Sequence, residues 1–227
     1  MQMKLIGIVL AFSVVFVSKG IAQVDIGLSG NLGYAYRLLR PNQNLDNSIL
    51  KLDEPTMGFE IGLVCRYQFS KKFSFGSGIH YSRLGISQVA IGVIVGAEER
   101  TFDFVHRFDF LSIPITAQYN VLEEKWFTPI IRIGFNNFIF LQEYVRTLED
   151  DWRENNAFNN RTYIPALSIG IGIQSKIVEK ISASITPNFT YHLMGVSNGN
   201  LRTRRHLYLA GVEFMVTYRL NKKEADD

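Results

Sequence analysis

The four histidines are the side chains in this sequence best suited to catalysis, because imidazole serves as a general base and as a metal ligand near neutral pH. Catalysis needs a nucleophile, a base and an orienting group at defined positions, and no motif here has that spacing. No His, Asp and Glu residues show the spacing of metal ligands. The two nearest arrangements are His192 with Thr190 or Ser197, and His106 between Asp103 and Asp109. We therefore predict no enzyme activity, no cofactor and no metal site.

Seven ionisable residues form a second group, because each falls on the small, polar side of an alternating segment. They are Asp25, Glu60, Arg66, His80, Arg132, Glu213 and Arg219. Charges buried inside a protein must be paired, or they cost several kcal/mol. If the segments form a barrel, we expect a salt-bridged plug in the lumen, with Asp25 close to Arg219 where the first and last strands meet. The alternative is a narrow ion or proton path that the same pairs gate.

Three arginines crowd into residues 201–206, LRTRRH: Arg202, Arg204 and Arg205. The guanidinium group matches the geometry of phosphate. One interpretation is therefore a contact with lipopolysaccharide phosphates, and the other is a solvated loop, since charge runs are usually solvated.

The elements that would position these side chains are eight segments of alternating sequence. In residues 24–37, VDIGLSGNLGYAYR, every second residue is apolar or tiny and the others are polar or small. A period of two is typical of a strand with two unlike faces. The pattern recurs in residues 57–69, 73–82, 111–119, 127–136, 167–174, 181–192 and 207–220. These lengths suit the roughly 9 to 11 residues that a tilted membrane strand needs.

Short and long connections alternate along the chain. The short ones are 70–72, 122–125 and 178–180, and the long ones are 38–55, 85–107, 141–163 and 194–206. Tight periplasmic turns and larger outer loops are typical of transmembrane barrels. The apolar alternation continues past Gly85, so residues 86–107 form either a protruding hairpin with an edge that could pair with a partner, or a lid, or two further strands.

The two faces of the segments differ in size and polarity. One carries the bulky apolar residues, and the other carries most of the strand glycines and the ionisable group above. Because an eight-stranded barrel has a lumen barely wide enough for side chains, the bulky face must meet lipid. The expected aromatic girdles are Tyr67, Phe69, Phe73, Tyr119, Trp126 and Tyr218 by the short turns, and Tyr34, Tyr36, Tyr81, Phe110, Tyr191 and Tyr208 towards the long loops. The predicted fold is all-β, an eight-stranded antiparallel transmembrane up-and-down β-barrel.

The N-terminus predicts export. Lys4 precedes an apolar run, Leu5 to Val17, and Gly20-Ile21-Ala22 offers small residues for cleavage. We expect residues 1–22 to be a signal peptide, 23–220 the barrel and 221–227 a charged C-terminal tail. Removing the signal lowers the net charge from +3 to +1, and such a chain has no field to attract nucleic acid. The single cysteine, Cys65, excludes an intramolecular disulfide.

Short pieces of the sequence carry a family resemblance: the Ala22-Gln23 junction, Phe69-Ser70-Lys71-Lys72-Phe73-Ser74 with Tyr81-Ser82, and Leu111-Ser112-Ile113-Pro114-Ile115. On these pieces the chain resembles small outer-membrane β-barrels of the porin-like family to which PorT-type proteins belong. Such barrels usually end on an aromatic residue, whereas this last strand ends Tyr218-Arg219-Leu220 before the tail. The resemblance implies the cell outer membrane and a structural or interaction role: membrane integrity, surface contact through extracellular loops, or a component of an envelope secretion apparatus. A small porin-like channel for ions or small solutes is the alternative.

Overall fold

Eight long strands and one short strand make up the described part of the chain. The computed structural model describes residues 23–41, 53–95, 98–122, 127–147, 152–154, 160–196 and 203–220. The predicted signal peptide and C-terminal tail lie outside these residues. The strands are β1 (Gln23–Pro41), β2 (Asp53–Gln68), β3 (Phe73–Val95), β4 (Glu98–Asn120), β5 (Thr128–Thr147), β6 (Arg153–Glu154), β7 (Tyr163–Val178), β8 (Ile181–His192) and β9 (Thr203–Arg219). Among the described residues, no helix is long and apolar enough to cross a membrane.

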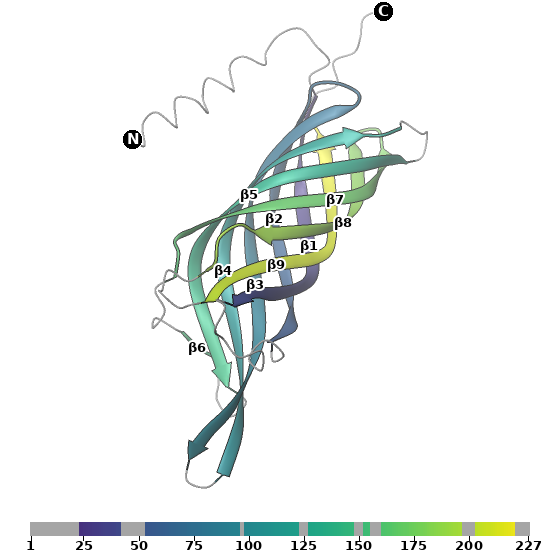
Figure 1. Cartoon of the computed structure of the whole chain (residues 1–227). Helices are drawn as coiled ribbons and strands as arrows, with labels where there is room; N and C mark the ends of the chain where they lie inside the picture. The colour runs from purple at the N-terminus through teal and green to yellow at the C-terminus, as the bar shows by residue number, and fades with distance from the viewer. Residues whose placement is uncertain are drawn as a thin grey trace, which may run out of the picture.

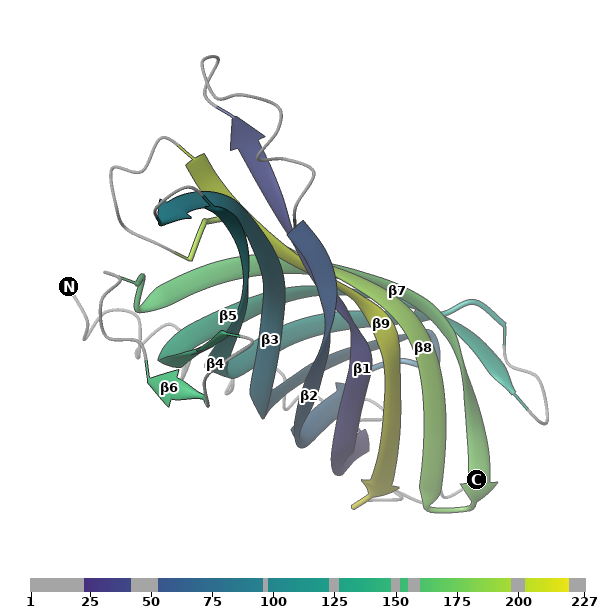
Figure 2. The same ribbon diagram turned by 90° about the horizontal axis from the view of Figure 1, so that it is seen from below.

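The long strands close into an antiparallel barrel, which confirms the predicted fold. Each pairs with its neighbour in the chain, β5 pairs with β7, and β1 pairs with β9 to complete the ring (Figures 1 and 2). A path along paired residues leaves β1 at Asp25 and returns to it at Ala35, ten residues further on, so the barrel has a shear of ten. The path runs through Arg66, Gly76, Thr116, Gly134, Ser168, Thr190 and Leu209.

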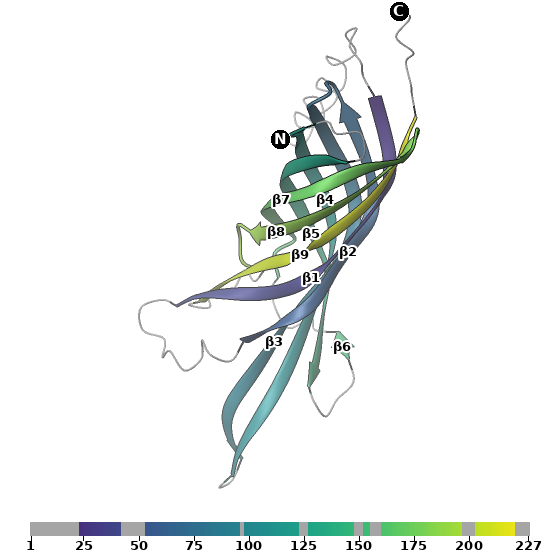
Figure 3. The ribbon, with the colours of Figure 1, turned by 90° about the vertical axis from the view of Figure 1, so that its right-hand side faces the viewer.

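The two ends of the barrel differ. Short connections join β2 to β3, β4 to β5 and β7 to β8 at one end, which we call the turn end. At the other, the loop end, long connections join β1 to β2, β5 to β7 and β8 to β9, whereas β3 ends at Val95 and β4 begins at Glu98. At the loop end β3 and β4 continue together from Ile86↔His106 to Val95↔Glu98. Figures 1 and 3 show this pair reaching well beyond the other strands. Of the three alternatives for residues 86–107, the structure therefore has the protruding hairpin.

The outward face of the barrel is apolar, as the alternation predicted. Its side chains have 56–70% of their surface exposed at six representative positions: Leu28, Met57, Leu63, Ile79, Ile133 and Ile171. A surface this apolar and continuous is not that of a soluble monomer. It matches the lipid-facing band of a transmembrane barrel.

The inward face changes character along the barrel. Towards the turn end it is polar and glycine-rich, but towards the loop end it is a buried apolar cluster that we call the apolar layer: Ala35, Leu84, Ile86, Phe108, Phe110, Phe138, Ile164, Ala166, Leu207 and Leu209. The prediction that Phe110 belongs to an outer aromatic girdle is wrong, because its side chain is fully buried in this layer. Phe110 follows the alternation of β4, so it faces the lumen while Leu111 faces outward. Apolar side chains close the lumen at this level.

Candidate functional site

Asp25 and Arg66 are the centre of what we call the charged layer, near the turn end. Arg66 Nη2 lies 2.7 Å from Asp25 Oδ2, and its Nε donates to the same oxygen at 3.2 Å. The two side chains are only 8% and 3% exposed. Arg219, which the register places opposite Asp25, has its Nε 3.6 Å from Asp25 Oδ1. Asp25 is therefore neutralised chiefly by Arg66, with Arg219 a weaker neighbour, because short charge-assisted hydrogen bonds are the strong ones.

A second ion pair crosses the lumen slightly deeper. Arg132 Nη1 of β5 lies 2.6 Å from Glu213 Oε1 of β9, and its Nη2 donates to Gln118 Oε1 at 3.0 Å. Gln174 accepts from Gln118 at 3.1 Å and from Arg66 at 2.7 Å, so the two ion pairs form one network. Sequence reasoning passed over both glutamines, although their places on the inward side of the alternation were visible.

Glu60 and His80 lie closer to the apolar layer and use neutral partners. Glu60 accepts from Asn31 Nδ2 at 3.2 Å and from Ser82 Oγ at 2.9 Å. His80 Nε2 is 3.0 Å from Ser29 Oγ. Within the described part of the chain neither residue is in an ion pair, so of the seven residues expected to form a salt-bridged plug the structure brings five into ion pairs.

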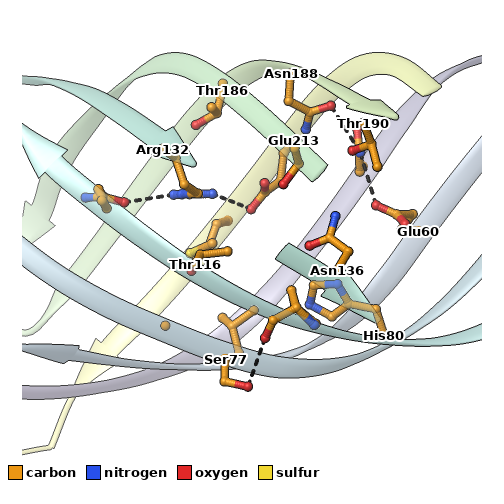
Figure 4. Close-up of a pocket in the computed structure, with 18 of the residues that line it drawn as sticks. Glu60, Ser77, His80, Thr116, Arg132, Asn136, Thr186, Asn188, Thr190 and Glu213 are labelled. Atoms are coloured by element: carbon orange, nitrogen blue, oxygen red, sulfur yellow. Dashed lines mark hydrogen bonds and ion pairs between the residues drawn. The ribbon is translucent and has the colours of Figure 1, made fainter. Parts of the chain in front are cut away.

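A small polar chamber separates the two layers. Along β9 the inward residues pass from the apolar Leu207 and Leu209 to Glu213 and then Arg219. The chamber lies at the level of Glu213, and Figure 4 shows Glu213, Glu60, His80 and Asn136 around it. Its volume is about 70 Å³, room for about five water molecules. Buried oxygens of Asn31, Asn136 and Thr186 line it, and in the described structure they lack hydrogen-bond partners. Water is the natural partner for such atoms.

His192 lies in the apolar layer. Its ring centroid is 4.5 Å from that of Phe138 and 6.0 Å from that of Phe110. The side chain is fully buried, and neither ring nitrogen has a hydrogen-bond partner among the described residues. Thr190 faces inward on the same strand without a hydrogen bond to it, and Ser197 lies outside the described residues. Thr190 therefore does not form the predicted pair with His192, and the pair with Ser197 stays a prediction.

His106 is paired with a residue that sequence reasoning missed. Its Nδ1 lies 2.9 Å from Glu143 Oε1, and Asn160 donates to Glu143 Oε2 at 2.8 Å. The register between β4 and β5 shifts between Asp109 and Phe110, and this bulge turns Glu143 inward although Leu141 points outward. Asp109 faces the other side and binds Arg83. The side chain of Asp103 lies outside the described residues.

The arginines of the last long loop are only partly described. Arg202 lies outside the described residues. Arg204 and Arg205 belong to β9, where the register sets them opposite Arg40 and Leu39 of β1. In the described part of the chain, no three His, Cys, Asp or Glu side chains are placed to hold a metal ion.

Comparisons with known proteins bear on the sequence and the fold. Residues 21–198 match the model of a family described as outer membrane protein beta-barrel domain. Similar solved structures include Neisserial surface protein A (10% identity, 86% of this chain and 97% of that one, TM-score 0.46), OprG from Pseudomonas aeruginosa (13%, 90% and 98%, 0.43) and Ail from Yersinia pestis (12%, 87% and 99%, 0.37). A search of curated proteins gives no match.

Proposed function

Because this chain belongs to the outer membrane protein β-barrel family and lies in the cell outer membrane, we propose that it is a non-enzymatic barrel with a structural or interaction role. The observation that carries this proposal is the filled lumen. The charged layer and the apolar layer both lie across it, and the chamber between them is about 70 Å³. Solute transport needs a continuous aqueous path, and two packed layers oppose one.

The β3–β4 hairpin is the feature that suits an interaction. β3 pairs with β2 no further than Gln88, and β4 pairs with β5 no further than Phe104, so in the described structure the tip beyond them pairs only with itself. Two free strand edges are a template for adding a partner strand. The sequence resemblance to PorT-type barrels supports a component of an envelope secretion apparatus as the partner.

Lipopolysaccharide is the second proposed contact. Arg204 and Arg40 stand directly opposite each other in the register of β9 and β1. The register therefore adds a third arginine position to the two of β9 at the loop end, and guanidinium groups match the geometry of phosphate. Exchanging Arg204 and Arg205 for glutamine should then weaken lipopolysaccharide retention during purification.

Affinity purification of the intact protein from membranes tests the interaction role. We expect secretion-apparatus proteins to co-purify with the native chain and to be lost with Val93→Pro, because proline removes a backbone donor from the hairpin. A barrel that purifies alone would contradict the partner and leave membrane integrity as the role. Lipid A extracted from a deletion strain should have an unchanged mass, and a changed one would contradict the non-enzymatic assignment.

A small channel is the alternative function, and the polar chamber is the observation that favours it. Planar-bilayer recordings separate the two functions. We expect no steady conductance from the native barrel. A steady conductance that changes in Glu60→Gln or Arg132→Gln would favour the channel instead.

A further inference from the structure

A cluster of arginines and one tryptophan lies on the outward face of the barrel just beyond the apolar band. We call it the rim cluster: Arg83 of β3, Arg107 of β4, Arg146 of β5 and Trp152 beside β6. On the same strands the outward residues nearer the turn end are apolar and exposed, among them Ile79, Ile115 and Ile133. The inward neighbours, Leu84, Ile86 and Phe108, belong to the apolar layer. The cluster therefore sits where the lipid-facing surface gives way to the cell-surface side.

Two guanidinium groups share one indole ring. The Cζ atom of Arg107 lies 3.7 Å from the centroid of the Trp152 ring, and that of Arg146 lies 5.0 Å from it. Stacking uses the flat face of a guanidinium and leaves its N–H edge for an anion. The indole thus holds two cationic groups close together in a fixed orientation.

The neighbouring groups keep this site positive. Arg83 is already engaged, since its Nε and Nη2 bind the two carboxylate oxygens of Asp109 at 2.8 Å each. Arg107 has the like charges of Arg83 and Arg146 nearby, and the opposing carboxylate of Asp109 is the one that Arg83 already binds. A group whose neighbours repel its own charge is stabilised by a bound anion. Arg107 and Arg146 are therefore the two arginines of the cluster that are suited to take one.

We propose that Arg107 and Arg146, stacked on Trp152, bind a phosphate group of the glycolipid in the outer leaflet of the outer membrane. The phosphate is the chemical match for paired guanidinium edges, and the position beside the apolar band puts acyl chains directly below it. Tryptophan is itself favoured at such an interface. This site is separate from the arginines of β9, so the two contacts can fail independently.

A binding titration tests the proposal with the full mature chain in detergent micelles. Trp126→Phe leaves Trp152 as the only tryptophan, and its fluorescence reports binding of bisphosphorylated lipid A. We expect a saturable change with the phosphorylated lipid and none with the fully dephosphorylated one. In that background Arg107→Gln with Arg146→Gln should weaken binding by about tenfold or more. The matched control, Lys71→Gln with Lys72→Gln, removes two charges at the turn end and should bind as before.

Heat-modifiable gel mobility verifies that each variant is a folded barrel. A second double variant, Arg107→Lys with Arg146→Lys, is a milder change because it keeps both positive charges. Because lysine lacks the planar fork, we expect this pair to bind several-fold more weakly than the native chain. Equal binding of both lipids, or equal weakening by the turn-end control, would overturn the proposal. So would a lysine pair that binds as well as arginine, since stacking would then contribute nothing.

Discussion

The two halves of the lumen are both filled by side chains, but by side chains of opposite character. Near the turn end, long charged side chains cross the barrel and are held by ion pairs and amides, as in Arg132 with Glu213 and Gln118. Near the loop end, aromatic and aliphatic side chains pack as in a soluble core, with the rings of Phe110 and Phe138 edge to face at 5.6 Å. Both halves are built on the same alternating strands. The alternation therefore decides whether a side chain points into the lumen or out of it, but not whether the lumen is polar or apolar at that level.

The difference predicts how each half responds to damage. In the charged layer, removing one charged side chain leaves its ionic partner without a counter-charge, because the partner is buried and has few other groups to pair with. In the apolar layer a deletion leaves a cavity and nothing unpaired. The following changes test this contrast.

The largest effect should come from Arg66→Leu. Among the described residues it leaves buried Asp25 with only Arg219 as a cationic neighbour, at 3.6 Å, and breaking a buried pair costs about 3–5 kcal/mol. Urea unfolding in detergent micelles, followed by heat-modifiable gel mobility, measures the free energy of unfolding. Arg219→Leu is the control and should cost clearly less. Equal losses would contradict the primary role of Arg66.

Phe138→Ala should come next, at about 3 kcal/mol, because it opens a cavity in the apolar layer. The same unfolding measurement applies. Phe135 lies on the same strand but faces outward and is 37% exposed, so Phe135→Ala is the matched control with the smaller loss. If the outward variant were the less stable one, the apolar layer would not be a core.

Arg132→Gln should lower the free energy of unfolding by about 2 kcal/mol, since it removes hydrogen bonds of a charged group. Adding Glu213→Gln should return part of that loss, because the stranded carboxylate is then neutral. Comparison of the two single variants with the double one measures the coupling. A strictly additive result would mean that the 2.6 Å pair is not energetically linked.

The smallest change should be stabilising. His192→Leu replaces a buried ring whose nitrogens lack partners among the described residues, and an unsatisfied buried polar group costs about 1–3 kcal/mol. Because leucine leaves some space, we expect a net gain of about 1 kcal/mol in the free energy of unfolding. His80→Leu is the contrasting variant. It should destabilise the barrel, because it leaves Ser29 without its partner at 3.0 Å. A loss in His192→Leu would show that the histidine is satisfied after all.

Particular residues mark where sequence reasoning succeeded and failed. Leu28, Leu63 and Ile171 point outward as predicted, because the period of two is a local property of each strand. The prediction placed Phe110 in the outer girdle because aromatic residues are common there. The alternation with Leu111 indicates instead that Phe110 faces the lumen. Glu143 was missed because a bulge between β4 and β5 reverses the alternation there, and no composition signal marks that bulge.

The sequence by itself determined the number of strands, their antiparallel order, the outward apolar face and the two unlike ends. Each of these follows from local alternation and from the lengths of connections. Only the tertiary structure decided which inward charges meet, because partners such as Arg132 and Glu213 come from strands that do not pair with each other. Their meeting depends on the shear of ten at closure, which is a property of the whole ring and of no single strand.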